Sequence, residues 1–343
     1  MEKIKFTPLL DSLYLEKISD SVYFSAKYSN YISNSRLSLI NPAQEGSPEL
    51  FFSGFKPKYS AAFDLGSGTH SLTLQKDLYE VCMEVDKPTA KMGALADRLY
   101  TTFLNHMPTI EEITKEAIIV DYYRGNLNQK KLDNIYEKCI PYWESRKAFE
   151  AFYDGTKELL YFDPKSRETV LNCVKALENN TLIQKLLHPT GLFENPISEM
   201  ELAILLDIKV EVPNHDPFIL KLKAKVDNFT VDKESNTITV NDVKTIGRIV
   251  SEMQMNIDRF HYNREFAVYS YLLSLCAKKF FGLENPTIKG NYLVVSTIPQ
   301  YYTKVIELTP QMFQEGFKEF QYLMKLVAMN VATNYKDFGI WNV

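Results

Sequence analysis

Residues 219–231 read ILKLKAKVDNFTV, and residues 237–244 read TITVNDVK. In the first segment apolar residues alternate with polar ones, mostly lysines, which is typical of a β-strand with one buried face. Residues 232–236 between the two segments read DKESN, which indicates a turn, and the second segment has the pattern of a returning strand. The two segments therefore predict a β-hairpin.

The sequence around this hairpin predicts further strands and long helices. Strand-like patterns cover three more segments: residues 202–212, 291–298 and 303–308. A long helix is expected over residues 251–282, and a last one from Thr309, an N-cap residue followed by proline, to about residue 330. Strands grouped together and flanked by helices favour an α/β (α+β) fold with a mixed central β-sheet.

The first half of the chain is predicted to be mainly helical. Residues 1–60 mix short apolar runs with serine, asparagine and proline, which indicates loops around short helices. Residues 64–75 predict a Gly-Ser-Gly turn that leads into a helix, and residues 109–180 have the periodicity of several helices, beginning with a capping-box pattern at Thr109. Three residues are expected to separate the helices of that block: Gly125, Pro141 and Pro164.

The composition is that of a globular protein. The chain has 343 residues, of which 45% are hydrophobic and 24% charged, so collagen-like, low-complexity and disordered classes are excluded. The formal net charge of −4 argues against a uniformly basic nucleic-acid-binding module. We expect a single domain made of an N-terminal segment (1–75), a mainly helical region (76–195) and an α/β core (196–343).

The cysteines give an indication of compartment and of cofactors. The four cysteines lie tens of residues apart with no Cys-x-x-Cys pair, which argues against a zinc ribbon or an iron–sulfur cluster and favours a reducing compartment. The N-terminus has no secretory pattern, and the apolar stretch 266–277 is too short to span a bilayer. A cytoplasmic protein is therefore expected.

Three residues of the predicted hairpin have the chemistry of a metal site. Asp242 and Lys244 are two residues apart and should project from the same side of their strand, with Asp227 of the preceding strand beside them. Carboxylate oxygens suit Mg²⁺, and a lysine next to the metal can position a water or stabilise charge on a phosphate. The pattern predicts metal-assisted phosphodiester hydrolysis. Because it is short, a solvated hairpin face with Asp–Lys pairs is the alternative.

Other motifs occur in a fixed order around these residues. Residues 66–70 read GSGTH, residues 198–202 read SEMEL, and residues 262–265 read YNRE, followed by FAVY. Together with Asp227 and the Asp242-Val243-Lys244 triplet, they resemble the PD-(D/E)XK nuclease superfamily. Within it the chain is most similar to phage exonucleases of the lambda-exonuclease and RecB/RecE type. The resemblance covers residues 60 to 275.

This resemblance implies a restriction-endonuclease-like fold and specific site residues. The implied metal ligands come from several motifs: His70, a glutamate that is Glu199 or Glu201, Asp227, Asp242 and the backbone carbonyl of Val243. Three further catalytic residues are implied: Lys244, which would orient the attacking water, Glu265 and Tyr262. The metal would be Mg²⁺, with Mn²⁺ able to replace it and Ca²⁺ binding without cleavage.

The chain departs from the family pattern at two places. Glu265 stands where the family has glutamine, although helical spacing can still point it at the sheet beside Tyr262. The segment from Glu201 to Asp227 is longer than expected, so the first carboxylate stays open between Glu199 and Glu201, with Glu211 a remote third choice. Glu199 is slightly favoured, because Ser-Glu before an apolar strand is the usual family reading.

The function that the resemblance implies is a Mg²⁺-dependent exonuclease acting on linear DNA, in phage-type recombination or DNA end processing. The alternative is an impaired nuclease fold that binds DNA ends or a partner. Five residues are candidates for DNA contact: Lys221, Lys223, Lys225, Ser35 and Arg264. The three lysines have a plainer interpretation as a solvated strand face. Expected partners are duplex DNA ends, further copies in a ring, and a single-strand annealing or recombination protein, with no membrane.

Overall fold

The computed structural model describes residues 3–53, 61–82, 88, 90–122, 127–152, 158–189 and 197–334. The chain divides into two compact units, one made of residues 1–66 and 175–343 and the other of residues 67–174. None of the helices within the described ranges is long and apolar enough to cross a bilayer.

The first unit contains a six-stranded sheet. Its strands follow in the spatial order β1 (Lys5–Lys17), β4 (Ile197–Glu211), β5 (Phe218–Asp232), β6 (Thr237–Ile246), β7 (Thr287–Ser296) and β8 (Thr303–Glu307). Neighbours pair antiparallel except β6 and β7, which are parallel. The prediction of a mixed central sheet flanked by helices is therefore confirmed, and the predicted hairpin is the β5–β6 pair.

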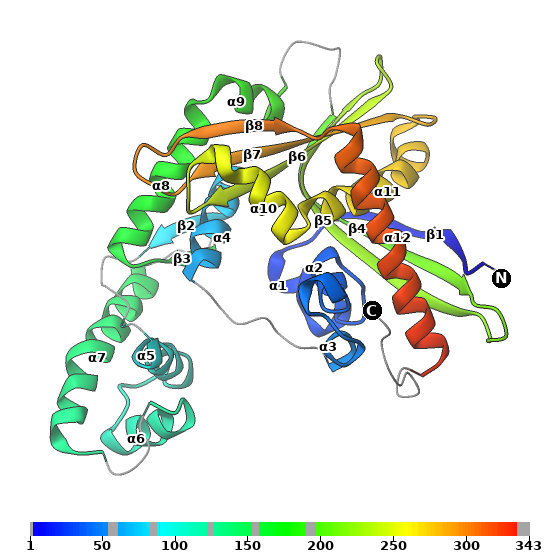
Figure 1. Ribbon diagram of the computed structural model, residues 1–343. Coiled ribbons are helices and arrows are strands. Elements are labelled where there is room, and N and C mark those ends of the chain that lie inside the picture. Colours follow the sequence, from blue (N-terminus) through cyan, green and yellow to red (C-terminus); the bar gives the residue numbers. More distant parts are fainter. Residues whose placement is uncertain are drawn as a thin grey trace. The chain divides into compact units, whose positions relative to one another are not determined.

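The helices of this unit include α1 (Asp20–Tyr23), α2 (Asn34–Ser38), α3 (Pro48–Ser53), α9 (Thr181–Leu187), α10 (Met253–Phe260), α11 (Tyr262–Cys276) and α12 (Pro310–Ala332). Helix α11 contacts β1, β5, β6 and β7, and α12 packs against α11 (Figure 1). The side chain of Thr309 caps α12 and Pro310 is its first residue, as the sequence predicts.

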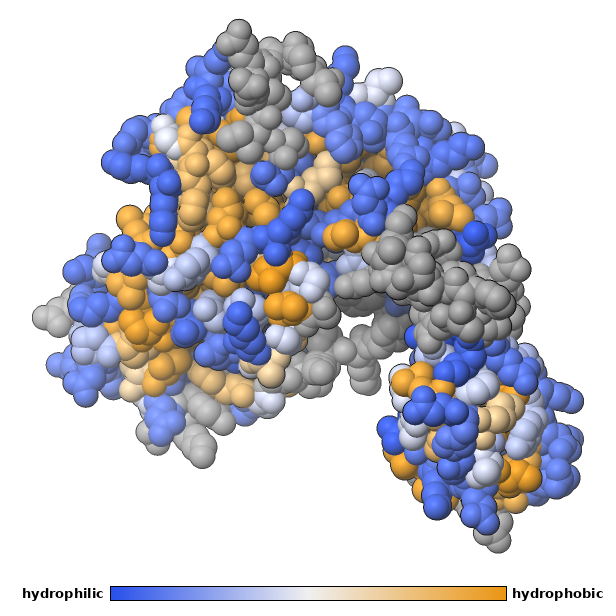
Figure 2. Space-filling view, turned by 180° about the vertical axis from the view of Figure 1, so that it is seen from behind, coloured by the Kyte–Doolittle hydropathy of each residue, from blue (hydrophilic) through white to orange (hydrophobic). Residues whose placement is uncertain are grey.

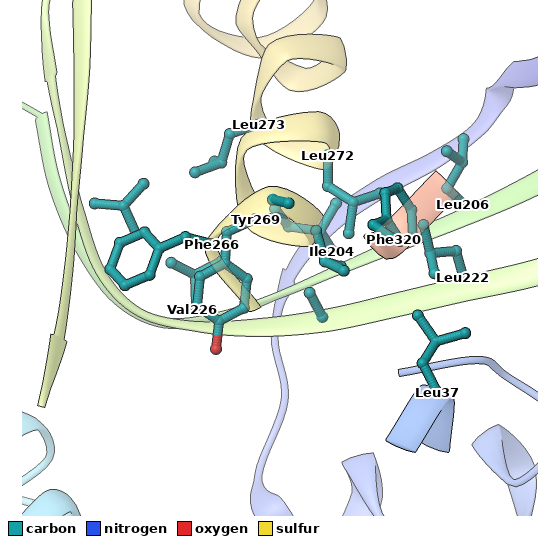
Figure 3. Close-up of a cluster of buried hydrophobic side chains, with 14 of the residues drawn as sticks. Leu37, Ile204, Leu206, Leu222, Val226, Phe266, Tyr269, Leu272, Leu273 and Phe320 are labelled. Atoms are coloured by element: carbon teal, nitrogen blue, oxygen red, sulfur yellow. The ribbon is translucent and has the colours of Figure 1, made fainter. Parts of the chain in front are cut away.

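The core of the first unit lies between α11 and the sheet. The apolar residues of β4 and β5 point toward α11, where Phe266 and Leu272 meet Ile204, Leu222 and others (Figure 3). Each large side chain buried in this way contributes about 1.5–3 kcal/mol relative to an exposed one. The alternation that predicts the hairpin thus also fixes which face of β5 is apolar.

The second unit is helical around its own core. Its helices include α5 (Ala90–Thr102), α6 (Ile110–Ile119) and α7 (Gln129–Phe152), which bury residues such as Leu95, Leu99, Ile113 and Ile135. Thr109 forms the predicted capping box with Glu112. A parallel pair of short strands, β2 (Tyr79–Cys82) and β3 (Glu158–Tyr161), also belongs to this unit. Helices α4 (Ala61–Leu74) and α8 (Pro164–Asn179) include the residues at which the two units meet along the chain.

Several boundaries predicted from the sequence are wrong. Residues 1–60 contain the long strand β1, and residues 64–75 contain no turn, because α4 runs through both glycines. Pro141 lies inside α7, where buried neighbours such as Cys139 and Tyr142 stabilise the helix despite the lost hydrogen bond. Gly125 lies outside the described residues.

The predicted helix 251–282 is also divided. His261 has the left-handed φ of 55° and separates α10 from α11, and residues Ala277–Phe281 form a π-helix before Gly282 ends it. The hydrophobic period continues across this break, which is why the sequence indicates one helix.

The face of the molecule seen in Figure 2 is largely hydrophilic, with smaller apolar areas between the polar side chains.

Candidate metal centre

Strands β5 and β6 separate at the two aspartates that the sequence singles out. Their pairing ends at Asn228 and Asn241, whose side chains are hydrogen-bonded over 2.7 Å. The next residues along the two strands, Asp227 and Asp242, do not continue this pairing. Instead, the backbone N–H of Val243 donates to Oδ2 of Asp227 over 2.9 Å. Both carboxylates are buried at this point of separation.

Lys244 links the aspartate of its own strand to α11. Its Nζ lies 2.7 Å from Oδ2 of Asp242 and 2.9 Å from Oε2 of Glu265. The same ammonium group lies 4.8 Å from the centre of the Tyr262 ring, and the hydroxyl of Tyr269 donates to Oε1 of Glu265 over 3.3 Å. Helical spacing places the three α11 residues on one face, and the structure brings that face to Asp242 and Lys244.

Glu201 on β4 lies beside Asp227. Ligand atoms of the two carboxylates are within 4.8 Å of each other, and Glu201 is 2% exposed. Its φ of 57° is in the left-handed region, which costs a non-glycine residue roughly 1 kcal/mol or more. A local distortion of β4 therefore accompanies the placement of this carboxylate.

Glu201, and not Glu199, is the glutamate whose carboxylate the structure brings to Asp227. The described contact of Glu199 is through its backbone carbonyl, which accepts from the side chain of Asn228 over 3.2 Å, and its side chain is half-buried. The slight preference for Glu199 came from the family pattern of the sequence, which contains no sign of the unusual φ at Glu201. Glu211 is far along β4 and pairs with Lys5 and Lys209.

A second lysine also contacts the carboxylates. The Nζ of Lys225 lies 2.7 Å from Oε2 of Glu201 and 2.5 Å from Oδ1 of Asp20, the first residue of α1. Burial opposes its charge, but Glu201 and then Asp20 raise the pKa of Lys225 above its ordinary value. Asp20 could not be identified from the sequence, because its partner is about two hundred residues away and no motif surrounds it.

The described cluster holds more negative than positive charge. It contains the carboxylates of Asp20, Glu201, Asp227, Asp242 and Glu265, against the ammonium groups of Lys225 and Lys244. Within the described part of the chain, neither oxygen of Asp242 accepts a hydrogen bond, and its contact with Lys244 is an ion pair. A hard divalent cation with oxygen ligands fits this deficit of positive charge.

The pKa shifts reflect the same imbalance. Burial, followed by the negative charges of Asp227 and Glu265, raises the pKa of Asp242 well above its usual range, although Lys244 opposes the shift. Burial alone would lower the pKa of Lys244, but Asp242 and Glu265 hold it well above the ordinary lysine value. Without another cation, Asp242 is therefore costly to ionise, while Lys244 stays charged.

His70, the remaining implied ligand, lies on α4 within the second unit and is half-buried. Glu201, Asp227 and Asp242 all belong to the first unit. The part of His70 in a metal centre stays a prediction from the sequence resemblance.

The lysines of β5 do not form an open stripe for a phosphate backbone. Lys223 is 7% exposed and donates to the backbone carbonyl of Tyr23 over 2.8 Å, and Lys225 is held as described above. Lys221 is more exposed, and its Nζ lies 4.0 Å from Oδ1 of Asp207. Burial, with a smaller effect from Arg36, lowers the pKa of Lys223 to about 8. Helix α1 covers Lys223 and Lys225 in the structure, and their contact with DNA stays a prediction from the sequence.

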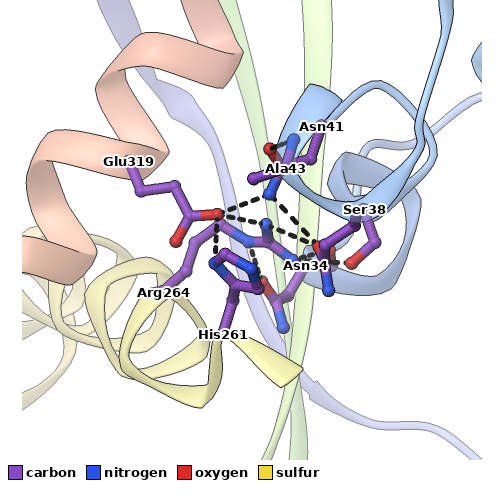
Figure 4. A network of polar contacts seen from close by, with 8 residues as sticks. Asn34, Ser38, Asn41, Ala43, His261, Arg264 and Glu319 are labelled. Carbon is purple, nitrogen blue, oxygen red and sulfur yellow. Dashed lines mark hydrogen bonds and ion pairs between the residues drawn. The ribbon is translucent and has the colours of Figure 1, made fainter. Parts of the chain in front are cut away.

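Arg264 is likewise unavailable to DNA. It is fully buried and donates to Oδ1 of Asn34 over 2.7 Å, to Oγ of Ser38 over 2.6 Å and to Oε1 of Glu319 over 2.8 Å (Figure 4). Glu319 also contacts Nδ1 of His261 at 2.9 Å. This network joins α2, α11 and α12, so Arg264 is a structural residue next to Glu265. Ser35 lies on α2, and its exposed hydroxyl contacts that of Ser33, so its contact with DNA stays a prediction.

No protein-family model matches the chain, and no curated protein matches its sequence. Among solved structures, the chain is similar to a crystal structure of a protein from Eubacterium rectale named "Putative exonuclease". The similarity has a TM-score of 0.45 and 11% sequence identity, and covers 93% of this chain and 88% of the other. Both values are too low to transfer that name to this chain.

Proposed function

We propose that this protein is a Mg²⁺-dependent nuclease that hydrolyses phosphodiester bonds of linear DNA, acting as an exonuclease of the PD-(D/E)XK type. The observation that carries the proposal is the meeting of Asp227, Asp242 and Lys244 where β5 and β6 separate. Buried carboxylates next to a charged lysine are the parts that this hydrolysis needs.

In this proposal Glu201, Asp227 and Asp242 hold the metal, and His70 and the backbone carbonyl of Val243 complete its ligands. The metal, when bound, would polarise the phosphoryl oxygen and lower the pKa of a bound water. Lys244 forms an ion pair with Asp242 and donates a hydrogen bond to Glu265, and these two contacts fix its position. Because its pKa is held high, Lys244 serves as a donor that orients water or phosphate, and not as the base that removes a proton.

Glu265 and the two tyrosines of α11 act through Lys244. Glu265 accepts hydrogen bonds from Lys244 and Tyr269, and the Tyr262 ring lies against the ammonium group. A glutamate here gives Lys244 a second anionic partner, where the family glutamine would offer a neutral amide oxygen. This ion pair also favours the second candidate function, a nuclease fold that binds DNA ends without cutting, because it restrains the lysine more strongly.

The test is degradation of end-labelled linear duplex DNA by the intact protein with Mg²⁺, Mn²⁺ or Ca²⁺. Asp242→Asn and Lys244→Met are expected to lower the rate on the order of 10³-fold, since each removes stabilisation of the transition state. Matched controls are Asp216→Asn and Lys289→Met, which replace exposed residues. Binding without metal-dependent cleavage would select the second candidate, and neither binding nor cleavage would exclude both.

A further inference from the structure

The Lys225 ammonium group is enclosed by the carboxylates of the candidate centre. It lies between Oδ1 of Asp20 at 2.5 Å and Oε2 of Glu201 at 2.7 Å. The side chain of Lys225 is 9% exposed and that of Glu201 only 3%. This is therefore a buried ion pair extended by a third group, and not one of the mobile pairs found on protein surfaces.

The carboxylate of Glu201 has two neighbours that matter for the number of bound cations, Lys225 and Asp227. One of its contacts is with Lys225, and a ligand atom of the same carboxylate lies within 4.8 Å of one from Asp227. In nucleases with two metals, the ions are roughly 3.5–4 Å apart and clamp the same phosphate from both sides. A carboxylate next to both ions is the natural link between them. Lys225 thus stands where a second cation beside Glu201 would be held.

We propose that the ammonium group of Lys225 is the permanent second cation of this centre, so that the protein takes one divalent ion where a two-metal nuclease takes two. The inference rests on the proposed metal centre of Glu201, Asp227 and Asp242, and specifies how many divalent ions that centre binds. Lys225 is in this view a positioning residue: it holds the Glu201 carboxylate and supplies a fixed positive charge on that side.

The position of Asp20 supports a cation at this place and not a contact with DNA phosphate. Asp20 is 44% exposed and lies on α1, whose Tyr23 carbonyl also accepts from Lys223. Oδ1 of Asp20 and Oε2 of Glu201 share the single positive charge of Lys225, so this group of three side chains is anionic overall and repels a phosphate. Replacing the ammonium group by a neutral side chain leaves two carboxylates without their shared cation, one of them open to solvent, and a divalent ion can then enter from the Asp20 side.

The experiment counts bound ions without using activity. Intact wild-type protein and the variants Lys225→Met and Lys225→Arg are titrated with Mn²⁺ and with Ca²⁺ alone, by calorimetry and by the electron paramagnetic resonance of free Mn²⁺. We expect one ion for wild type and for Lys225→Arg, and two for Lys225→Met. Adding Asp20→Asn to Lys225→Met should return the number to one. Lys221→Met, on the same strand and face, is the control and should bind one ion.

Two results would overturn the inference: two ions bound by wild type, or one ion bound by Lys225→Met. The first result is decisive even if Lys225→Met does not fold. A wild-type protein that binds no Mn²⁺ or Ca²⁺ contradicts the metal centre of the proposed function itself, which separates the two failures.

Discussion

The carboxylate of Asp227 accepts a hydrogen bond from the backbone N–H of Val243 over 2.9 Å, next to Asn228 and Asn241, where the pairing of β5 and β6 ends. A side chain here takes the place of a backbone partner. The bond satisfies a buried N–H that would otherwise lose its hydrogen bond where the strands part. It also fixes one oxygen of Asp227 relative to Asp242, the residue before Val243. The two proposed ligands are thus positioned by backbone geometry before any metal binds.

Asp227→Asn should separate the structural from the metal-binding role of this carboxylate. The amide oxygen of asparagine can still accept from Val243, so the free energy of unfolding is expected to change little. The lost negative charge should weaken Ca²⁺ binding at least tenfold. Asp227→Ala leaves the N–H without its acceptor and should lose a further 1–3 kcal/mol or so of stability. Urea unfolding and Ca²⁺ calorimetry measure the two effects, and equal Ca²⁺ affinity in wild type and Asp227→Asn would contradict the role.

Glu201 and Glu199 give a direct comparison of the two candidate first carboxylates. Glu201 is buried beside Asp227, whereas the described contact of Glu199 is through its backbone. Glu201→Gln should therefore weaken Ca²⁺ or Mn²⁺ binding by an order of magnitude or more, and Glu199→Gln should leave it close to wild type. Calorimetric titration of both variants with Ca²⁺ or Mn²⁺ shows which of the two glutamates is the metal ligand. The reverse order of affinities would assign the ligand to Glu199.

A structural feature can be predicted from the sequence when the residues that decide it lie close together in the chain. The hairpin was predicted because its alternation and turn lie within about twenty-five residues, and the same spacing placed Asp242 and Lys244 on one side. Strand β1 was missed because it pairs with β4, almost two hundred residues later in the chain. Nothing near Lys5–Lys17 signals that partner.

In the candidate site, too, some features follow from nearby residues and others depend on distant segments of the chain. The face of α11 that carries Tyr262, Glu265 and Tyr269 follows from helical periodicity alone. The burial of Lys223 does not, because it depends on α1 lying over β5. Alternating lysines read as a solvated face unless another segment covers them, and that cover is a tertiary property. The burial of Arg264 cannot be predicted from its own segment for the same reason, since its partners come from α2 and α12.

Lys223 predicts a specific dependence of stability on pH. Burial lowers its pKa to about 8 in the folded protein, from 10.5 in its ordinary state. A lysine with a lowered folded-state pKa costs stability while it is charged. That cost falls as pH rises from 8 to 10.5, because the folded state releases the proton first. The melting temperature of wild type minus that of Lys223→Met should therefore increase over this range. Thermal unfolding at pH 7, 9 and 10 measures it, and a difference that is constant or falls with pH would refute the assignment.

Arg264 should affect folding and leave the electrostatics of DNA binding unchanged. Its guanidinium group is fully buried and bound to Asn34, Ser38 and Glu319, so Arg264→Met removes one partner of a buried ion pair. Such a loss destabilises proteins by about 3–5 kcal/mol. Arg248→Met is the control, because Arg248 forms an exposed pair with Glu252, and such pairs contribute at most about 1 kcal/mol. Urea unfolding should rank the two variants in this order.

The same variant tests the correction of the predicted DNA contact. An arginine that binds phosphate releases counterions, so its removal lowers the slope of log K against log salt concentration by roughly 1. Arg264→Met should keep the wild-type slope for linear duplex DNA, measured by fluorescence anisotropy at temperatures where the variant is folded. A slope reduced by that amount, with stability unchanged, would mean that Arg264 leaves its network to reach the DNA backbone.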